Sequence, residues 1–355
     1  MIKILHSADW HLDAPLQLPD PGQAQFLREA LAQIPEKIAA LCKKEGCDLM
    51  LLAGDLFDGA CSAETLQDVK RILRDAQVPV FITPGNHDYA NAGSVWTSTA
   101  WPENVHIFTR SSLDSLVLED LDLRIYGGGF TGMDCPGLLE GFSAKGPEKY
   151  KIALLHGDPT QANSPYCPVS RQQVVFSGLD YLALGHIHKG DSFRAGKTLC
   201  AWPGCPMGRG YDETGDKGVL IVTLDAQAQA TFLPLDVPRF HDLQLPAGDD
   251  PIRALNAVLP AFGSADFYRI TFTGNCKPLD TASLLRPEFP NLTLRDRTLP
   301  PVDLWGSAGQ DTFEGRFFQL LQDKLRDADA PSQERILLAA QIARKLLDGQ
   351  EVVLP

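Results

Sequence analysis

The sequence lacks several features that would place it in a specialised class of protein. No apolar run approaches the roughly 20 residues that a membrane-spanning helix needs, and the first residues, MIKILHSADW, do not have the layout of a signal peptide. Internal repeats and low-complexity tracts are also absent. With 44% hydrophobic and 22% charged residues, the 355-residue chain has the composition of a globular protein of about two domains. We therefore expect a soluble, cytoplasmic protein that does not associate with membranes.

The cysteines lack an organising pattern. The chain has eight of them, scattered without a CxxC pair or a finger-like spacing. This distribution argues against a disulfide framework and against a cysteine-based zinc site, and it predicts reduced, mostly buried thiols.

Positive charge is also scarce. The chain has 32 Lys and Arg residues against 45 Asp and Glu residues, which gives a formal net charge of −13. This balance argues against a protein that binds nucleic acid through bulk charge. It leaves open a protein that does so through metal ions or through a partner.

Short apolar runs alternate with helical patterns in the first two thirds of the chain. The runs at 3–7, 48–53, 78–83, 151–155 and 181–184 predict buried strands, and the segments 22–45 and 62–76 predict helices. This alternation is typical of an α/β domain. Further strands are expected at 105–109, 116–118, 123–126, 198–202, 218–224 and 230–235. They lie too close together for helical crossovers, so we expect antiparallel additions and either a mixed sheet or a two-sheet sandwich.

The last third of the chain predicts a smaller unit and a helical tail. Between the flanking prolines 234 and 238 and a linker at 300–309, the pattern predicts strands at 241–245, 267–273 and 291–295 and helices at 251–261 and 281–285. Two amphipathic helices follow, one opening at Asp311 with Glu314 as a capping-box residue and one at 331–347. We expect domains at residues 1–237, 238–305 and 306–355.

Polar side chains follow each of the five predicted buried strands. In order, the strands lead to Asp9-Trp10-His11, Gly54-Asp55, Gly85-Asn86-His87-Asp88, His156-Gly157-Asp158 and Gly185-His186-Ile187-His188. In open α/β sheets ligands bind outside the carboxyl ends of the strands, so these side chains should share one cleft. Carboxylate oxygens and imidazole nitrogens suit Mn, Fe or Zn. The pairs Asp9/His11 and His186/His188 have i, i+2 spacing, which an extended backbone points to one side. Asp55 stands alone after its glycine and is expected to bridge two metal ions.

Each of these motifs also has an ordinary structural explanation when it is taken alone. An Asp-x-His pair is common by chance, and Gly-Asn-His-Asp can be a simple turn. Two imidazoles at the end of an apolar strand are poor core residues, however, and five such strand ends in one chain favour a functional site. The remaining histidines, His6, His106 and His241, are expected to be structural.

The order DxH, GD, GNHD, a lone His and GHxH resembles the calcineurin-like metallophosphoesterases, over roughly residues 1–225. Four segments are similar to the DNA-repair nuclease branch of the SbcD and YhaO type: HSADWHLDAPL, GDLFDG in place of the GDxxDRG of phosphoprotein phosphatases, GLDYLALGHIHKG, and WPGCPMGRGYDETGDKG. The resemblance implies an α/β fold, a two-sheet sandwich flanked by helices, followed by a small α+β cap domain and C-terminal helices.

The resemblance also implies roles for individual residues. One metal ion would be held by Asp9, His11, Asp55 and His188, and a second by Asp55, Asn86, His156 and His186. Manganese is the first expectation, with iron or zinc as alternatives. His87 would be the general acid that protonates the leaving oxygen after an activated water attacks phosphorus, and Asp88 would orient it.

The expected function is hydrolysis of DNA phosphodiester bonds by an exonuclease or endonuclease of DNA repair. The expected partners are DNA, an SbcC-like coiled-coil ABC-type ATPase that docks on the C-terminal helices, and a second copy of the chain in a homodimer. Two alternatives remain at this point: a phosphoesterase for a small-molecule or protein substrate, and a non-catalytic scaffold subunit. The apolar stripes of the C-terminal helices would also suit packing on their own domain.

Overall fold

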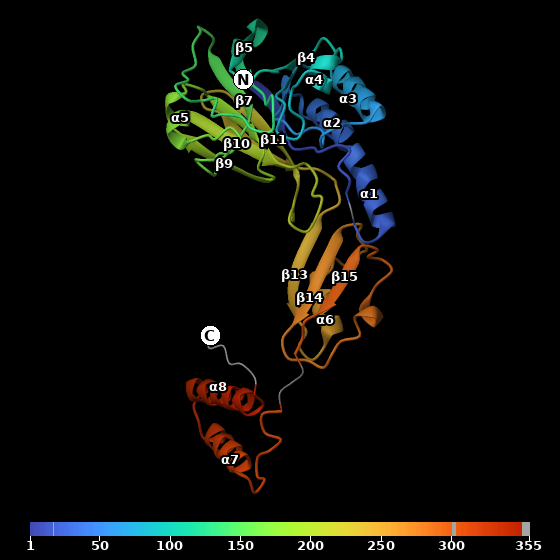
Figure 1. Ribbon diagram of the computed structural model, residues 1–355, viewed down its shortest axis with the longest axis vertical. Coiled ribbons are helices and arrows are strands. Elements are labelled where there is room, and N and C mark those ends of the chain that lie inside the picture. The colour runs from blue at the N-terminus through green and yellow to red at the C-terminus, as the bar shows by residue number, and fades with distance from the viewer. Residues whose placement is uncertain (17, 300–302, 350–355) are drawn as a thin grey trace. The chain divides into compact units, whose positions relative to one another are not determined.

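The computed structural model describes residues 1–16, 18–299 and 303–349, and the chain divides into two compact units (Figure 1). The first unit comprises residues 1–242 and 265–269, and the second comprises residues 243–264 and 270–355. The first unit therefore extends five residues beyond the expected boundary at 237. The further division of the second unit into a cap domain and a helical tail stays a prediction.

A six-stranded mixed sheet contains the N-terminal strand. The strand order is β12-β11-β1-β2-β3-β4, and β1 to β4 run parallel while β11 and β12 add antiparallel to one edge. The strands are β1 Ile2–Ser7, β2 Leu49–Leu52, β3 Val80–Ile82, β4 Val105–Ile107, β11 Gly218–Leu224 and β12 Gln229–Pro234. The carboxyl ends of β1, β2 and β3 consequently meet at one edge, as the sequence predicts.

A second six-stranded sheet has the order β5-β6-β7-β8-β10-β9. Strands β6, β7, β8 and β10 are parallel, and β5 and β9 pair antiparallel at the two edges. The strands are β5 Asp114–Leu118, β6 Leu123–Gly128, β7 Tyr150–His156, β8 Tyr181–Gly185, β9 Lys189–Ala195 and β10 Thr198–Gly204. The predicted α/β two-sheet sandwich is confirmed.

The expectation that the later strands are all antiparallel additions is wrong for three of them. Strand β4 pairs parallel to β3, β6 to β7 and β10 to β8. The chain returns to the starting edge before β4 through residues 83–104, which include helix α4 Val95–Ser98, and before β10 through the edge strand β9, which the sequence pattern missed. Strand β9 has mostly exposed side chains and therefore lacks the apolar alternation of a half-buried strand.

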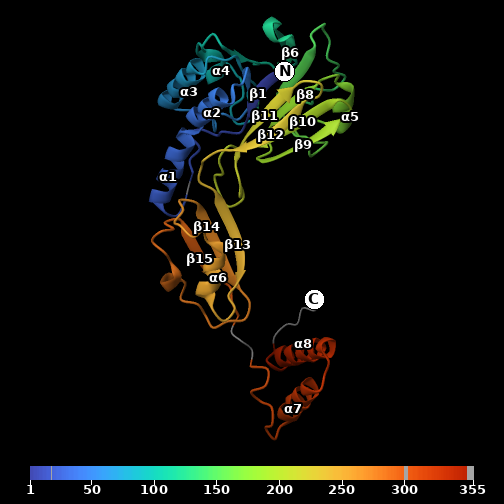
Figure 2. The same ribbon diagram turned by 180° about the vertical axis from the view of Figure 1, so that it is seen from behind.

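Three apolar layers hold the first unit together. Alternate residues of β7 face opposite ways, so that Ile152 and Leu154 fill the space between the sheets while Ala153 and Leu155 pack on the outer face of the second sheet. Helices α1 Pro21–Ala32, α2 Ile34–Glu45 and α3 Ala63–Asp75 cover the outer face of the first sheet, and α5 Arg171–Phe176 lies on the opposite side of the sandwich (Figures 1 and 2). The single helix predicted at 22–45 is two helices, because Pro35 lacks the N–H that a continuous helix requires.

The two sheets make direct polar contact through His6. This β1 side chain is buried, and its ring nitrogens lie 2.7 Å from the Tyr181 hydroxyl and 3.0 Å from the Leu184 carbonyl oxygen, both on β8. Burial lowers the pKa of His6 to about 3, so the imidazole stays neutral. The expectation that His6 is a structural core histidine is confirmed.

The sheets approach each other closely where β8 ends beside β1 and β2. A Cβ atom added at Gly185 would lie 1.9 Å from the Ala53 carbonyl oxygen and 2.9 Å from the Ala8 Cβ. Only a glycine fits such an approach. This contact brings the polar residues that follow β8 against those that follow β1 and β2.

The second unit begins within a three-stranded sheet of order β13-β14-β15. Its elements agree closely with the prediction: β13 Phe240–Pro246, α6 Pro251–Val258, β14 Phe267–Thr273, a 3₁₀ turn at Thr281–Leu284, and β15 Leu292–Asp296. Another 3₁₀ turn, Glu119–Leu121, lies in the first unit. Residues 300–302 of the predicted linker lie outside the described residues.

Helices α7 Phe313–Arg326 and α8 Ala330–Leu347 pack against each other. Thr312, not Asp311, caps α7 by accepting a hydrogen bond from the Gly315 N–H, so the predicted opening at Asp311 is one residue early. Glu314 pairs instead with Arg344 of α8, at 2.6 Å. In the ranges described, no helix is both long enough and apolar enough to cross a membrane.

A substitution at Gly185 tests the close approach of the sheets. Gly185→Ala is expected to lower the free energy of unfolding by about 1–3 kcal/mol, because the new methyl group overlaps the Ala53 carbonyl oxygen. Urea denaturation measures the change. Gly132→Ala is the matched control, since its added Cβ meets no atom within 4 Å. Equal stability of the two variants would contradict the argument.

Candidate metal centre

The loops that carry the candidate ligands are held together by their backbones. Residues 8–12 run beside residues 54–58, with hydrogen bonds from Asp9 N to Gly54 O (3.0 Å) and from His11 N to Asp55 O (3.0 Å). Asp9, His11, Asp55 and His186 all have positive φ angles, between 48° and 92°. The expectation that an extended backbone aligns the i, i+2 pairs is therefore wrong. Left-handed backbone aims these side chains instead, at a cost of order 1–3 kcal/mol per residue, and such strain clusters at functional sites.

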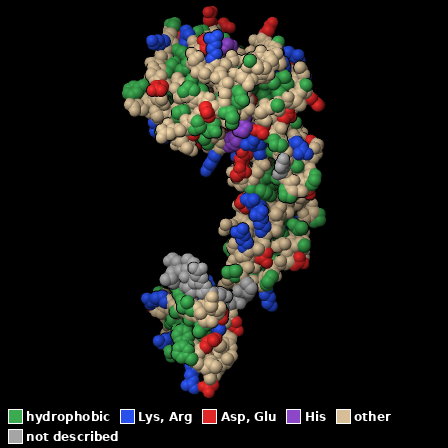
Figure 3. Space-filling view, viewed as in Figure 1, with side chains coloured by type: hydrophobic (Ala, Val, Ile, Leu, Met, Phe, Trp, Pro, Cys, Tyr) green, Lys and Arg blue, Asp and Glu red, His purple; other side chains and the backbone are tan. Residues whose placement is uncertain are grey.

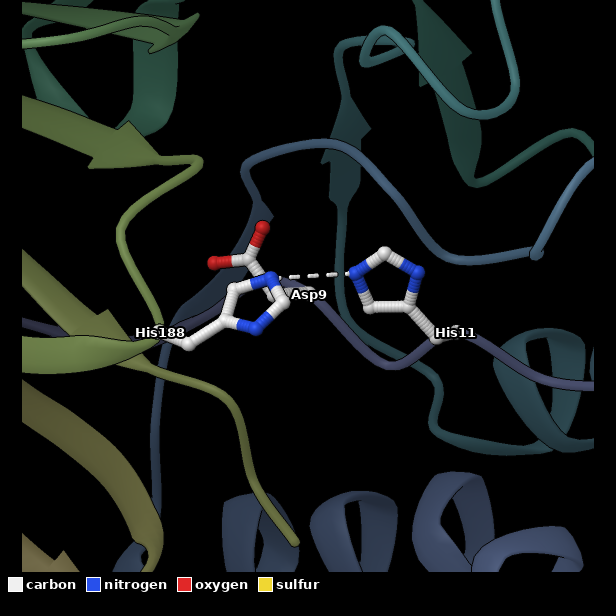
Figure 4. Close-up of side chains that lie close together, drawn as sticks. All are labelled: Asp9, His11 and His188. Atoms are coloured by element: carbon white, nitrogen blue, oxygen red, sulfur yellow. Dashed lines mark hydrogen bonds between the residues drawn. The ribbon is translucent and has the colours of Figure 1, made fainter. Parts of the chain in front are cut away.

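Asp9, His11 and His188 come together from the loops that follow β1 and β8 (Figure 4). One ligand atom from each lies within 4.8 Å of the others, and the two Nε2 atoms of His11 and His188 are 3.2 Å apart. Asp9 and His11 are buried, and burial raises the pKa of Asp9. A carboxylate and two imidazoles in this arrangement are a typical donor set for a divalent transition metal.

The hydrogen bonds at the far side of each ring decide which nitrogen is free. His11 Nδ1 lies 3.0 Å from Asp58 Oδ1, and His188 Nδ1 lies 2.5 Å from Glu213 Oε1. Carboxylates only accept hydrogen bonds, so each Nδ1 carries its proton and each Nε2 presents a lone pair. Two lone pairs that face each other at 3.2 Å repel unless a cation lies between them. The residues present therefore fit a metal ion.

A second group of acceptors surrounds His156. Its Nδ1 donates to the Ala53 carbonyl oxygen at 2.8 Å, which leaves Nε2 as an acceptor. That Nε2 lies 3.0 Å from Asn86 Oδ1 and 3.4 Å from Asp55 Oδ2. Asp55 Oδ2 is also 3.8 Å from His11 Nε2, so this one carboxylate stands between the two groups. The geometry suits a bridging ligand of a two-metal site.

His186 lies at the margin of the second group. Its backbone N–H donates to Asp9 Oδ1 at 3.0 Å, and its ring packs edge-on to His156 with 5.2 Å between ring centroids. The Tyr166 ring lies against its other side, at 4.8 Å. Burial lowers the pKa of His186 to about 4, so the imidazole is in the neutral form that metals bind.

His87 pairs with Asp58, a residue that sequence reasoning did not select. His87 Nδ1 lies 2.9 Å from Asp58 Oδ1, and this oxygen is also the acceptor for His11. The hydrogen bond from His11 holds the pKa of Asp58 below its usual value, so the acceptor is ionised. Asp58 is the last acidic residue of the segment GDLFDG, three positions after Asp55. This position next to a predicted ligand is the feature of the sequence that could have identified it.

Asp88, the expected orienting partner of His87, has a different place. Its carboxylate accepts hydrogen bonds from the backbone N–H groups of Gly85 (2.7 Å), Leu56 (2.8 Å) and Phe57 (3.2 Å). Burial, with the nearby Asp55 charge, raises the pKa of Asp88 to about 7. The expected orienting contact with His87 is therefore corrected to Asp58, because the turn at 85–88 directs Asp88 inward. Asp88 ties the loop of His87 to the loop of Asp55.

Glu213 and Arg209 form a second support that sequence reasoning missed. Glu213 accepts from His188 and from the Arg209 guanidinium (3.1 Å) and backbone N–H (2.8 Å). Although burial opposes its charge, these hydrogen bonds hold the pKa of Glu213 well below its usual value. Both residues lie in the segment WPGCPMGRGYDETGDKG. The residues of that segment do not by themselves indicate that it packs against His188.

The family model described as calcineurin-like phosphoesterase matches residues 2–190, more than half of the chain. The chain belongs to this family. This match confirms the resemblance seen in the sequence.

Two similar proteins support placing the chain in the SbcD- and YhaO-like branch of the family. The chain is 35% identical over 239 residues to the uncharacterized metallophosphoesterase YhaO of Bacillus subtilis, a match that covers 62% of this chain and 57% of YhaO. It is 22% identical over 273 residues to the SbcD component of the SbcCD nuclease of the same organism, covering 65% of this chain and 68% of that protein. A dimetal phosphatase from Danio rerio aligns in structure with a TM-score of 0.43 and 12% identity, over 65% of this chain and 96% of that one. The match thus spans less than two thirds of YhaO.

Removing the charge of Glu213 tests its support of His188. Glu213→Gln is expected to weaken Mn²⁺ binding about 10–100-fold, because the proton on His188 Nδ1 loses its ionised acceptor. Calorimetric titration of metal-free protein with Mn²⁺ measures the affinity.

Glu148 is a closely matched control for Glu213. Its side chain is also 9% exposed and also pairs with an arginine, Arg124 at 2.7 Å, but it contacts none of the candidate ligands. Glu148→Gln should therefore leave Mn²⁺ affinity unchanged. An equal loss in both variants, or no loss in either, would contradict the assignment.

Proposed function

We propose that the chain is a two-metal-ion phosphodiesterase that hydrolyses DNA phosphodiester bonds. The observation that carries the proposal is the convergence of acceptor atoms in two adjacent groups, with Asp55 between them and His87 beside them. Bound divalent ions would supply an activated water and would neutralise charge on the phosphate. This arrangement serves phosphoester hydrolysis better than redox or acyl-transfer chemistry.

The proposed ligand sets follow from the two groups. Asp9, His11, Asp55 and His188 hold one ion, and Asp55, Asn86, His156 and His186 hold the other. Oxygen and neutral imidazole donors without a thiolate favour manganese, with iron or zinc as alternatives.

His87 is the proposed general acid. Its side chain is 47% exposed and can therefore reach a substrate, while Asp58 orients the ring. As water attacks phosphorus and the P–O bond to the leaving group breaks, His87 gives its proton to the departing oxygen. Asp58 keeps one proton on Nδ1, so the proton that His87 gives to the leaving oxygen comes from Nε2.

DNA is the proposed substrate on the strength of the relatives, since one of them is part of a nuclease. The net charge of −13 predicts weak DNA affinity for the chain alone. The face shown in Figure 3 agrees, because acidic side chains are interspersed with the basic ones. The proposal therefore includes a partner protein that contributes most of the DNA-binding affinity.

The helix pair α7–α8 is the proposed docking site for a coiled-coil ABC-type ATPase of the SbcC kind. Several large apolar side chains of this pair are exposed, among them Phe313, Leu320, Leu346 and Leu347. An amphipathic helix pair with an uncovered apolar face is typical of helix-in-groove recognition. A homodimer and a cytoplasmic location stay predictions.

The role of His87 has a direct test. His87→Gln is expected to lower kcat for Mn²⁺-dependent phosphodiester hydrolysis about 10²–10⁴-fold, because the leaving oxygen loses its proton donor. Metal content, measured by mass spectrometry, should stay at the wild-type level. The control is His106→Gln, since the His106 ring lies tilted against Phe81 and edge-on to Phe108, and it is not among the proposed ligands. Turnover of His87→Gln near that of wild type would remove the assignment.

Comparison of two substrates tests the choice of DNA. Wild type and Asp55→Ala are incubated with Mn²⁺ and either linear duplex DNA or bis(p-nitrophenyl) phosphate, with and without a coiled-coil ATPase partner. The proposal expects wild type to cleave both, with DNA cleavage enhanced by the partner, and Asp55→Ala to cleave neither. Cleavage of the generic ester with DNA untouched in every mixture would point to a small-molecule or protein phosphoester. Failure on both would favour a scaffold.

A further inference from the structure

A cavity of about 280 Å³ lies beside His87. Its lining combines residues of the proposed site with two side chains that have no part in it: Asp58, Gly59, Asn86, His87, Tyr89 and Met133. This volume is near the lower end of the range for small-ligand sites, about 300–1,000 Å³. The cavity therefore has room for one small group of a substrate and not for a long segment.

The proposed chemistry decides which group that is. A general acid must lie within about 2.6–3.2 Å of the oxygen it protonates. If His87 is that acid, the leaving oxygen lies at His87, and the atoms attached to it extend into the cavity that His87 lines. The cavity is then the subsite for the leaving group.

The walls of this cavity include apolar side chains and no lysine or arginine. Met133 is 69% exposed, which is unusual for a large apolar side chain, and it lies on the long connection between β6 and β7. Tyr89 is half-buried and packs against the core on the outer face of the second sheet, so its ring has a firm support. None of the six lining residues is a lysine or arginine. With Tyr89 and Met133 in its wall, the cavity suits an uncharged, flat group.

We propose that Met133 and Tyr89 form the binding site for the nucleobase of the leaving nucleoside, an inference that rests on the proposed function. A methionine thioether contacts aromatic rings favourably and adapts to rings of different shape. A tyrosine ring offers a face on which any base can stack. The two side chains would therefore hold the leaving nucleoside without selecting one base over another, as a general DNA phosphodiesterase requires.

Hydrolysis of two dinucleoside phosphates tests the subsite. One substrate is thymidylyl-thymidine, and the other carries an abasic tetrahydrofuran in place of the leaving thymidine, so that the leaving oxygen is chemically similar but the base is missing. Met133→Ala is expected to lower kcat/KM for the first substrate about tenfold and to leave the second nearly unchanged. Met133→Leu should restore most of the loss, because it keeps the apolar contact.

Phe176→Ala is the matched control. Phe176 is 66% exposed on α5 and lines a different cavity, so its removal should affect neither substrate. If Met133→Ala lowers kcat/KM equally for both substrates, or for neither, the subsite is not a base-binding site.

A binding measurement separates this inference from the proposed function. Saturation-transfer NMR of the Mg²⁺-loaded protein with thymidine needs no turnover and should show contact with the base protons. The signal should fall at least several-fold in Met133→Ala and persist in Phe176→Ala. Absence of the signal in wild type, or its survival in Met133→Ala, would overturn the inference whatever the activity. Thymidine binding in a protein that cleaves no DNA would instead leave the subsite in place and remove the proposed function.

Discussion

The close approach of the two sheets at the ends of β1, β2 and β8 is the constraint on which the rest of the site depends. Gly185 lies where even a methyl group would overlap the Ala53 carbonyl oxygen, and buried His6 joins the same strands by hydrogen bonds to both ring nitrogens. Residues that follow strands in different sheets consequently meet. Without that approach, the ligands after β8 would lie too far from those after β1 and β2 to share a metal ion.

The geometry of this site destabilises the metal-free fold but suits the binding of a cation. Asp9, His11 and Asp55 have left-handed backbone, and their side chains converge as acceptors with few donors among them. Each of these features opposes folding of the metal-free chain. A bound cation reverses the electrostatic part of the cost, so metal binding and the stability of this region are expected to be linked.

Two carboxylates outside the proposed ligand sets give the imidazoles their direction. Asp58 holds His11 and His87 through one oxygen, and Glu213 holds His188 while Arg209 holds Glu213. In each case the carboxylate keeps a proton on Nδ1, which leaves Nε2 free to bind metal or to transfer a proton. Asp58 thereby couples the proposed general acid His87 to the proposed ligand His11. A substitution of either histidine is therefore expected to alter the hydrogen bonding of the other.

The sequence by itself determined the buried strands, because a run of Ile, Leu and Val is a local signal for a buried strand, and it placed the candidate ligands at the ends of those strands. It did not reveal the exposed edge strand β9. It also predicted the three strands of the smaller sheet. Tertiary structure alone decided which side chains support those ligands: Asp58 rather than Asp88 reaches His87, and Glu213 reaches His188 across 25 residues. It also decided the parallel pairing of β4 and β10 and the left-handed backbone at Asp9 and His11. The physical reason is that hydrophobic periodicity is a local property of the chain, whereas a hydrogen bond between loops depends on how the two sheets pack.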